Sequence, residues 1–162
     1  MTNYQIFSAL VIGVLATGFL DVFGIVLNRL FGIPTTEWRY IGRWFARMRY
    51  LEFHHAAISK ATPVRGELAI GWFMHYLIGI AFSLTYFVWV YVILDYSPTL
   101  LSGTLFGLIT LAAPYLIMQP ALGHGFFARK HSKPILMPTL SFLAHLTFGQ
   151  SLYAFHYLLV GI

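Results

Sequence analysis

The fold is decided by Leu68–Leu94, LAIGWFMHYLIGIAFSLTYFVWVYVIL, a stretch that contains no charged side chain. A helix needs about 20 predominantly apolar residues to cross a bilayer. Such a segment is expected to be helical, because lipid cannot hydrogen-bond an open backbone. The whole chain is 59% hydrophobic and only 9% charged, whereas soluble domains carry about 25% charged residues. We therefore expect an all-α integral membrane protein.

Three further stretches have the length and composition of spans, at about 4–28, 99–122 and 135–160. With the span at about 68–94 they predict a four-transmembrane-helix bundle that forms a single integral membrane domain over residues 1–162. The first stretch follows a start without basic residues and lacks a small-residue cleavage pattern. We expect it to be a retained span and not a signal peptide.

The basic residues predict the orientation. All ten Lys and Arg fall in two segments, seven within 29–65 and three within 129–133. The N-terminal tail, the turn at 95–98 and the C-terminal end have none. The positive-inside rule then places both basic loops in the cytoplasm and both termini in the periplasm. This topology accounts for the net charge of +5, which is therefore no indication of nucleic-acid binding.

An amphipathic segment at about 37–55 lies inside the first basic loop. Arg39, Arg43 and Arg47 recur every four residues on one helical face, opposite a face with Trp38 and Ile41. This pattern predicts a helix at the inner membrane surface with its cations toward anionic lipid headgroups. The alternative is a lid over a site between the spans. His54 and His55 follow this segment and are expected at the surface.

Two spans share a short repeat. The second span reads HYLIGIAF from His75 and the fourth reads HLTFGQSL from His145, so that Gly79 and Gly149 follow the histidines at the same spacing. The repeat suggests two pseudo-symmetric helical hairpins related by an axis along the membrane normal. A glycine one turn after a histidine lies on the same helical face. It would let another helix, or a flat ligand, approach closely.

Polar groups of different spans fall at one depth. Asp21, His75 and His145 each lie roughly 12–15 Å from the cytoplasmic end of a span, at 1.5 Å per residue. Further polar or ligating residues close the third span in the same half, namely Met118, Gln119 and His124. Since polar groups in lipid are costly, they face the bundle interior and pair. The pattern predicts an intramembrane site.

The residues leave several functions open for this layer. It could fix helix register by hydrogen bonds, hold haem b between His75 and His145, or bind a divalent metal ion or protons with Asp21. A lipid-like or quinone-like ligand is a fourth alternative. The competing hypothesis is a non-catalytic accessory or structural subunit of a larger membrane complex, in contact with partner membrane proteins or with copies of itself.

The sequence assigns no catalytic residue. It contains none of the glycine-rich nucleotide loops, serine-hydrolase elbows or zinc-protease motifs that would indicate an enzyme of those classes. It also contains no cysteine, so a metal ion would need His, Asp, Glu, Met or carbonyl ligands. His156 lies roughly 16 Å beyond His145 along the same face and is expected at the membrane interface.

Several phrases resemble a family of bacterial membrane proteins, domain of unknown function 2938. They are GRW, PVRGE, GWFMHYLIG, MQPALGHG and SFLAHLTFG, and the resemblance runs from about Gly18 to Tyr153. It implies a small bacterial inner-membrane protein and lends no mechanism. The motif positions include much of the polar layer, and they add Arg43 and His55 as residues that would support or cover the site.

Overall fold

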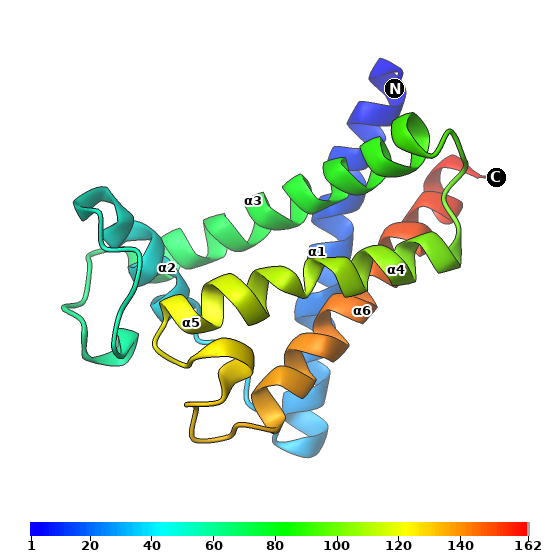
Figure 1. Cartoon of the computed structure of the whole chain (residues 1–162). Helices are drawn as coiled ribbons and strands as arrows, with labels where there is room; N and C mark the ends of the chain where they lie inside the picture. Colours follow the sequence, from blue (N-terminus) through cyan, green and yellow to red (C-terminus); the bar gives the residue numbers. More distant parts are fainter. Residues whose placement is uncertain (162) are drawn as a thin grey trace. The chain divides into compact units, whose positions relative to one another are not determined.

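The computed structural model describes residues 1–161, and these residues form helices and connecting turns without a strand (Figure 1). The principal helices are α1 (Asn3–Phe31), α2 (Trp38–Arg47), α3 (Glu67–Val88), α4 (Leu100–Thr110), α5 (Gln119–Ala121) and α6 (Leu136–Val160). Two π-helical segments, η3 (Trp89–Ile93) and η4 (Ala113–Met118), continue α3 and lead from α4 to α5. The expected all-α class is confirmed.

Three helical stretches among the described residues are long and apolar enough to cross a membrane: Asn3–Phe31, Glu67–Ile93 and Leu100–Ala121. They lie within three residues of the predicted span boundaries. The fourth predicted span forms α6, which has 25 residues but is not among the three. It contains His145, Gln150 and His156, whose polarity makes it less apolar than the other long helices.

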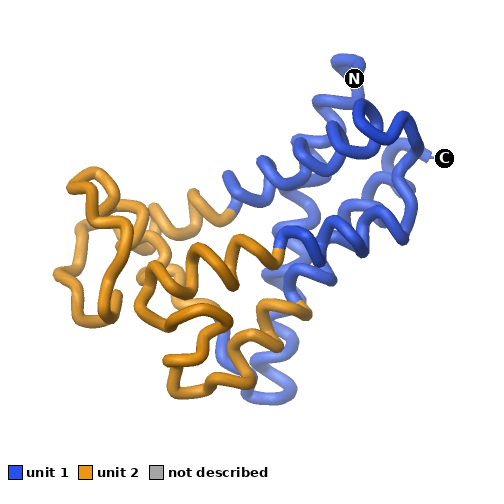
Figure 2. Tube along the Cα trace, in the orientation of Figure 1, with its two compact units in different colours: residues 1–35, 76–110, 144–162 blue, residues 36–75, 111–143 orange. Residues whose placement is uncertain are grey.

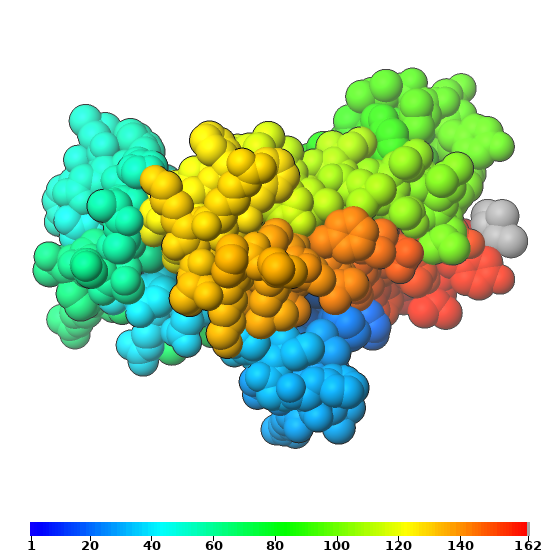
Figure 3. Space-filling view, turned by 60° about the horizontal axis from the view of Figure 1, so that its bottom comes forward, coloured from blue at the N-terminus to red at the C-terminus, as the bar shows by residue number. Residues whose placement is uncertain are grey.

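The chain divides into two compact units (Figure 2). Unit 1 comprises residues 1–35, 76–110 and 144 onward, and unit 2 comprises residues 36–75 and 111–143. The division runs through α3 and α6, so each unit contains part of these helices. Exposed apolar side chains occur throughout, for example Leu30 and Phe31 in the last turn of α1, at 69% and 70% exposure; the end of α1 is light blue in Figure 3. Such surface suits contact with lipid chains.

Unit 1 is held together where glycines bring helix backbones into contact. A Cβ atom on Gly103 of α4 would lie 2.5 Å from the carbonyl oxygen of Gly149 on α6, and one on Gly107 would lie 2.5 Å from that of His145. Gly13 of α1 likewise meets the Ile80 backbone of α3 at 2.9 Å. Small residues allow this close packing in membrane helices. The apolar core between them includes, as its fully buried members, Ala9, Ile12, Ala16, Tyr86, Phe87, Val90 and Leu152.

Unit 2 contains α2 packed on the first turns of α3. Gly42 and Gly71 lie at this crossing, and a Cβ atom on either would overlap the backbone of the other helix. The following loop folds back, since Trp44 Nε1 donates to the carbonyl of Phe53 at 2.9 Å. The predicted amphipathic segment is therefore helical over Trp38–Arg47 with a 3₁₀ turn to Tyr50, and shorter than residues 37–55.

The loop after α2 also pairs with the end of α5. His55 N donates to the carbonyl of Ala121 at 2.8 Å, and Ile58 N donates to that of Leu122 at 3.1 Å. Gly123 adopts a left-handed conformation with φ of 91° and lies against the carbonyl groups of His55 and Ala56. A side chain would fit neither this conformation nor this contact. These bonds fix the loop within unit 2.

Candidate functional site: polar pairs between the helices

Asp21 of α1 accepts a hydrogen bond from Tyr76 of α3. The distance from the Tyr76 hydroxyl to Asp21 Oδ2 is 2.9 Å, and both residues are partly buried. Gly18, almost one turn earlier on α1, leaves room for the hydroxyl, because a Cβ atom there would lie 3.7 Å from it. A carboxylate within a membrane span is costly unless it is paired. The tyrosine supplies such a partner within unit 1.

His145 of α6 is bonded to Thr110 of α4, and this bond favours one tautomer of the imidazole. The Thr110 hydroxyl lies 2.8 Å from His145 Nδ1 and donates its single proton to the carbonyl of Gly107, also at 2.8 Å. With the hydroxyl proton on this carbonyl, which can only accept, His145 Nδ1 is the donor to Thr110. Nε2 of the neutral ring is then unprotonated, and it has no hydrogen-bond partner within residues 1–161. An imidazole with its N–H held in this way is oriented to bind a proton or a metal through the other nitrogen.

The H-x-x-x-G spacing serves helix packing at both places. A Cβ atom on Gly79 would collide with the Thr17 side chain of α1, and one on Gly149 would lie 2.8 Å from Gly107 Cα. The predicted close approach of another helix is thus confirmed for both glycines. The helix face that carries Gly149, one turn after His145, is in contact with α4. This contact leaves no space for a macrocycle on that side of the His145 ring.

His75 lies in unit 2, where its ring packs against Trp38 at an interplanar angle of 33° with 4.0 Å between centroids and contacts Trp72 at 5.9 Å. Asp21 and His145 belong to unit 1. A site shared by all three residues therefore stays a prediction. Over residues 1–161, no group of three or more His, Asp or Glu side chains lies close enough to hold a metal ion.

The other candidates of the third span and the loops lie in unit 2. Met118 packs against the apolar cluster around Trp44, and Gln119 Nε2 donates to Ser141 Oγ at 3.1 Å. Gln119 Oε1 and His55 Nε2 are buried side-chain atoms without a hydrogen-bond partner among the described residues. His54 is exposed as expected, whereas the expectation of a surface position is wrong for His55, which is 8% exposed.

His124 lies against His131, with 4.7 Å between ring centroids and the rings perpendicular. Burial, and then the neighbouring His131, lowers the pKa of His124 below its ordinary value of 6.5. His131 Nδ1 accepts a hydrogen bond from Lys133 N at 3.0 Å, so this nitrogen is unprotonated. The pair forms part of the connection before α6.

Arg43 is a buried structural residue. Its Nε and Nη2 donate to the two carboxylate oxygens of Glu67 at 2.8 and 3.0 Å, and Nη1 donates to the carbonyls of Ile58 and Ala61 at 3.1 and 2.9 Å. The hydrogen bond to Glu67 raises the pKa of Arg43, although burial opposes it. The four-residue spacing with Arg39 predicted that Arg43 points its charge toward lipid headgroups. For Arg43 that prediction is wrong, because its guanidinium is buried and hydrogen-bonded to Glu67.

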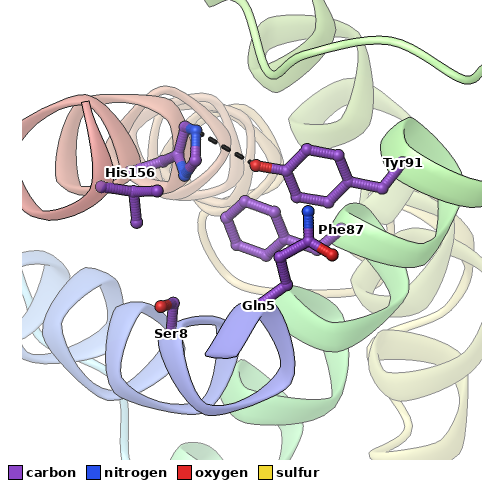
Figure 4. A pocket seen from close by; sticks show the side chains of 6 residues that line it. Gln5, Ser8, Phe87, Tyr91 and His156 are labelled. Atoms are coloured by element: carbon purple, nitrogen blue, oxygen red, sulfur yellow. Dashed lines mark hydrogen bonds between the residues drawn. The ribbon is translucent and has the colours of Figure 1, made fainter. Parts of the chain in front are cut away.

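A cavity that the sequence did not predict lies in unit 1 (Figure 4). Its volume is about 10 Å³, and its lining comes from three helical segments: Gln5, Ser8, Phe87, Tyr91, His156 and Val160. Figure 4 shows the Tyr91 hydroxyl reaching His156 Nε2, at 3.2 Å. His156 is 7% exposed, so this predicted interfacial residue has a buried side chain. The sequence signal for the cavity is the set of polar residues near the same end of three long apolar stretches, which an interpretation based on histidines alone misses.

These features define an all-helical protein with helices of membrane-crossing length and hydrogen-bonded polar pairs between them. The resemblance in the motifs is confirmed by a family model that matches residues 10–159. The chain belongs to this family, which is described as "Protein of unknown function (DUF2938)". No curated protein and no solved structure matches the chain significantly.

Proposed function

We propose that the chain is a four-span protein of the bacterial inner membrane, with both termini in the periplasm, that takes up and releases protons at polar pairs inside its helices. The three long apolar stretches support membrane insertion. The length of α6 and its lack of Asp, Glu, Lys and Arg support a fourth span. The clustering of all basic residues in two loops supports the orientation.

The geometry around His145 carries this proposal. Thr110 holds its Nδ1–H, and Nε2 offers a lone pair in a helix that has no Asp, Glu, Lys or Arg. Imidazole is the side chain that gains and loses a proton most readily near neutral pH. The Tyr76–Asp21 hydrogen bond adds a second protonatable pair in unit 1.

A proton fits these pairs better than the other ligands considered. A metal ion needs several ligands, usually three or four from the protein, whereas a proton needs one acceptor. Haem would need open space beside a histidine, and the glycine face next to His145 is occupied by α4. One imidazole with a defined tautomer suffices for proton uptake.

The test is proton flux into liposomes that contain the purified protein and an internal pH-sensitive dye. A potassium gradient with valinomycin drives the flux, and protein-free liposomes give the background rate. We expect a wild-type rate above this background. His145→Asn keeps a donor where Nδ1 lies but removes Nε2, and we expect it to return the rate to background. Asp21→Asn, which can still accept from Tyr76, should lower the rate as well.

The matched control is His54→Asn, which alters an exposed histidine outside the spans and should leave the rate unchanged. Circular dichroism and a single gel-filtration peak establish that each variant is folded. A folded His145→Asn protein with the wild-type rate, or a wild-type protein without flux, contradicts the proposal. A visible haem band or a stoichiometric metal in the purified protein would favour the other ligands, and co-purifying chains without flux would favour the accessory subunit.

A further inference from the structure

The cavity beside His156 adjoins an open hollow through one residue, Tyr91. The hollow is lined by Tyr91, Asp95, Tyr96 and Ser97 and has a volume of about 480 Å³. Tyr91 also lines the small cavity and bonds to His156. The residues that line the cavity and the hollow all belong to unit 1. The tyrosine therefore has an open acidic hollow on one side and a buried imidazole on the other.

Local backbone geometry places Tyr91 there. Residues 89–93 form a π-helical segment, in which Leu94 N donates to the carbonyl of Trp89 at 3.0 Å. The chain then turns at Asp95, which adopts a left-handed conformation with φ of 51°. π-helical turns within α-helices are rare and occur frequently at functional sites, and left-handed backbone at a residue other than glycine is uncommon. Two unusual features thus flank the hollow.

The small cavity beside His156 is suited to a single water molecule. Its volume of about 10 Å³ is near the minimum for one water, which also needs two to four polar partners. Gln5 and Ser8 of α1 supply an amide and a hydroxyl, and Tyr91 and His156 supply a phenol and an imidazole. Tyr91 is the one titratable lining residue besides His156. Among residues 1–161, the other charged groups near this end are Asp95 in the hollow and the amino group of Met1, one turn before Gln5.

We propose that this cavity is a proton-binding site, in which His156 takes up a proton from the solution that fills the Asp95 hollow, by way of the Tyr91 hydroxyl. The carboxylate raises the local concentration of protons, and the hydroxyl can accept one proton while it donates another. This site rests on the proposed function, for which it would form the entrance at the end of the helices where α3 turns toward α4. In this step one proton enters the cavity, and the neutral His156 imidazole becomes a positively charged imidazolium.

The apolar core explains why this site needs to be separate from His145. Phe87 packs on His156 with 5.5 Å between centroids, and Phe82 packs on His145 at 6.3 Å. Between them lies the buried cluster that includes Tyr86, Phe106 and Leu152. No hydrogen bond within residues 1–161 joins the two histidines directly. A proton bound to His156 would therefore pass on to His145 only after a rearrangement of the helices.

The test follows His156 by nuclear magnetic resonance in the full protein, labelled with ¹⁵N-histidine and placed in lipid nanodiscs, with the proton as the probe. His156→Gln assigns its resonances. We expect the His156 nitrogens to titrate reversibly between pH 4 and 9, a range of about 2.5 units on each side of the ordinary histidine pKa. We also expect Tyr91→Phe to displace the Nε2 resonance, while Tyr157→Phe, at a residue that is 51% exposed, leaves it in place.

Asp95→Asn should slow proton flux in liposomes and weaken its dependence on ionic strength, because the hollow loses its charge. An Nε2 resonance that does not titrate, or that is indifferent to Tyr91→Phe, overturns the entrance site even when flux through the protein is intact. Titration of His156 without any flux in liposomes supports the site and contradicts the proposed function instead. The two proposals can therefore fail separately.

Discussion

Substitution of Glu67 by glutamine should destabilise the protein strongly, because Arg43 then keeps a positive charge without its counterion. In the native protein two hydrogen bonds of 2.8 and 3.0 Å join the guanidinium to the carboxylate, and Val64 N donates to the same carboxylate at 3.0 Å. The two charged side chains are 7% and 8% exposed. Removal of one partner of a buried pair costs about 3–5 kcal/mol. The pair joins the surface helix α2 to α3, so we expect the lower end, about 3 kcal/mol.

The matched control is Glu52→Gln, which breaks the other ion pair of unit 2. Arg47 and Glu52 lie 2.6 Å apart, but their side chains are 18% and 42% exposed, and such pairs contribute about 0–1 kcal/mol. Unfolding by SDS in mixed micelles, followed by tryptophan fluorescence, compares the two variants. Trp38 and Trp44 on α2 report on this region. Equal losses in Glu67→Gln and Glu52→Gln would refute the reasoning, as would a stable Glu67→Gln protein.

Three further predictions concern packing, pH and orientation. Gly103→Ala should prevent folding or destabilise the protein by several kcal/mol in the same SDS titration, since its Cβ would lie 2.5 Å from a backbone oxygen, whereas Gly18→Ala, with a 3.7 Å contact, should be tolerated. Because the pKa of His124 is lowered in the folded protein, the unfolded chain binds the proton first, so stability should fall as pH drops below about 6.5; His131→Gln should weaken this dependence. A reporter active only in the cytoplasm should work when it is fused within residues 39–60, and activity of a periplasmic reporter there would reverse the topology.

Much of the fold could be predicted, because a chain in lipid must satisfy its backbone hydrogen bonds internally. The long apolar stretches had to be helices, and their boundaries follow from where polar residues resume. The glycines of the H-x-x-x-G repeat were expected to admit another helix or a flat ligand, and in the structure a neighbouring helix lies against both of them. The length of the amphipathic segment could not be predicted, because it depends on bonds between distant residues. Trp44 and Phe53 close the loop that ends it.

The need of Asp21 and His145 for hydrogen bonds could be predicted from their positions in long apolar stretches, but their partners could not. Asp21 and His145 could be identified as costly residues that needed hydrogen bonds, yet Tyr76 and Thr110 belong to the most ordinary residues of an apolar helix. Which residues become the hydrogen-bond partners of Asp21 and His145 depends on the helix faces that the glycine contacts bring together. Arg43 is a second example of a residue whose partner could not be predicted from the sequence. Its spacing matched a lipid-facing row, and only the position of Glu67 on a neighbouring helix reveals that it is buried.

The degree to which a buried polar group is satisfied separates a structural role from a chemical one in this protein. Each nitrogen of the Arg43 guanidinium donates at least one hydrogen bond, to Glu67 or to a backbone carbonyl, so this residue acts by holding α2 on α3. His145 is bonded through Nδ1 alone. Its second nitrogen, on a partly buried ring, has no hydrogen-bond partner within residues 1–161, and an unpaired polar group in an apolar environment costs about 1–3 kcal/mol. Loss of proton flux in a folded His145→Asn protein would mean that this cost is retained for chemistry.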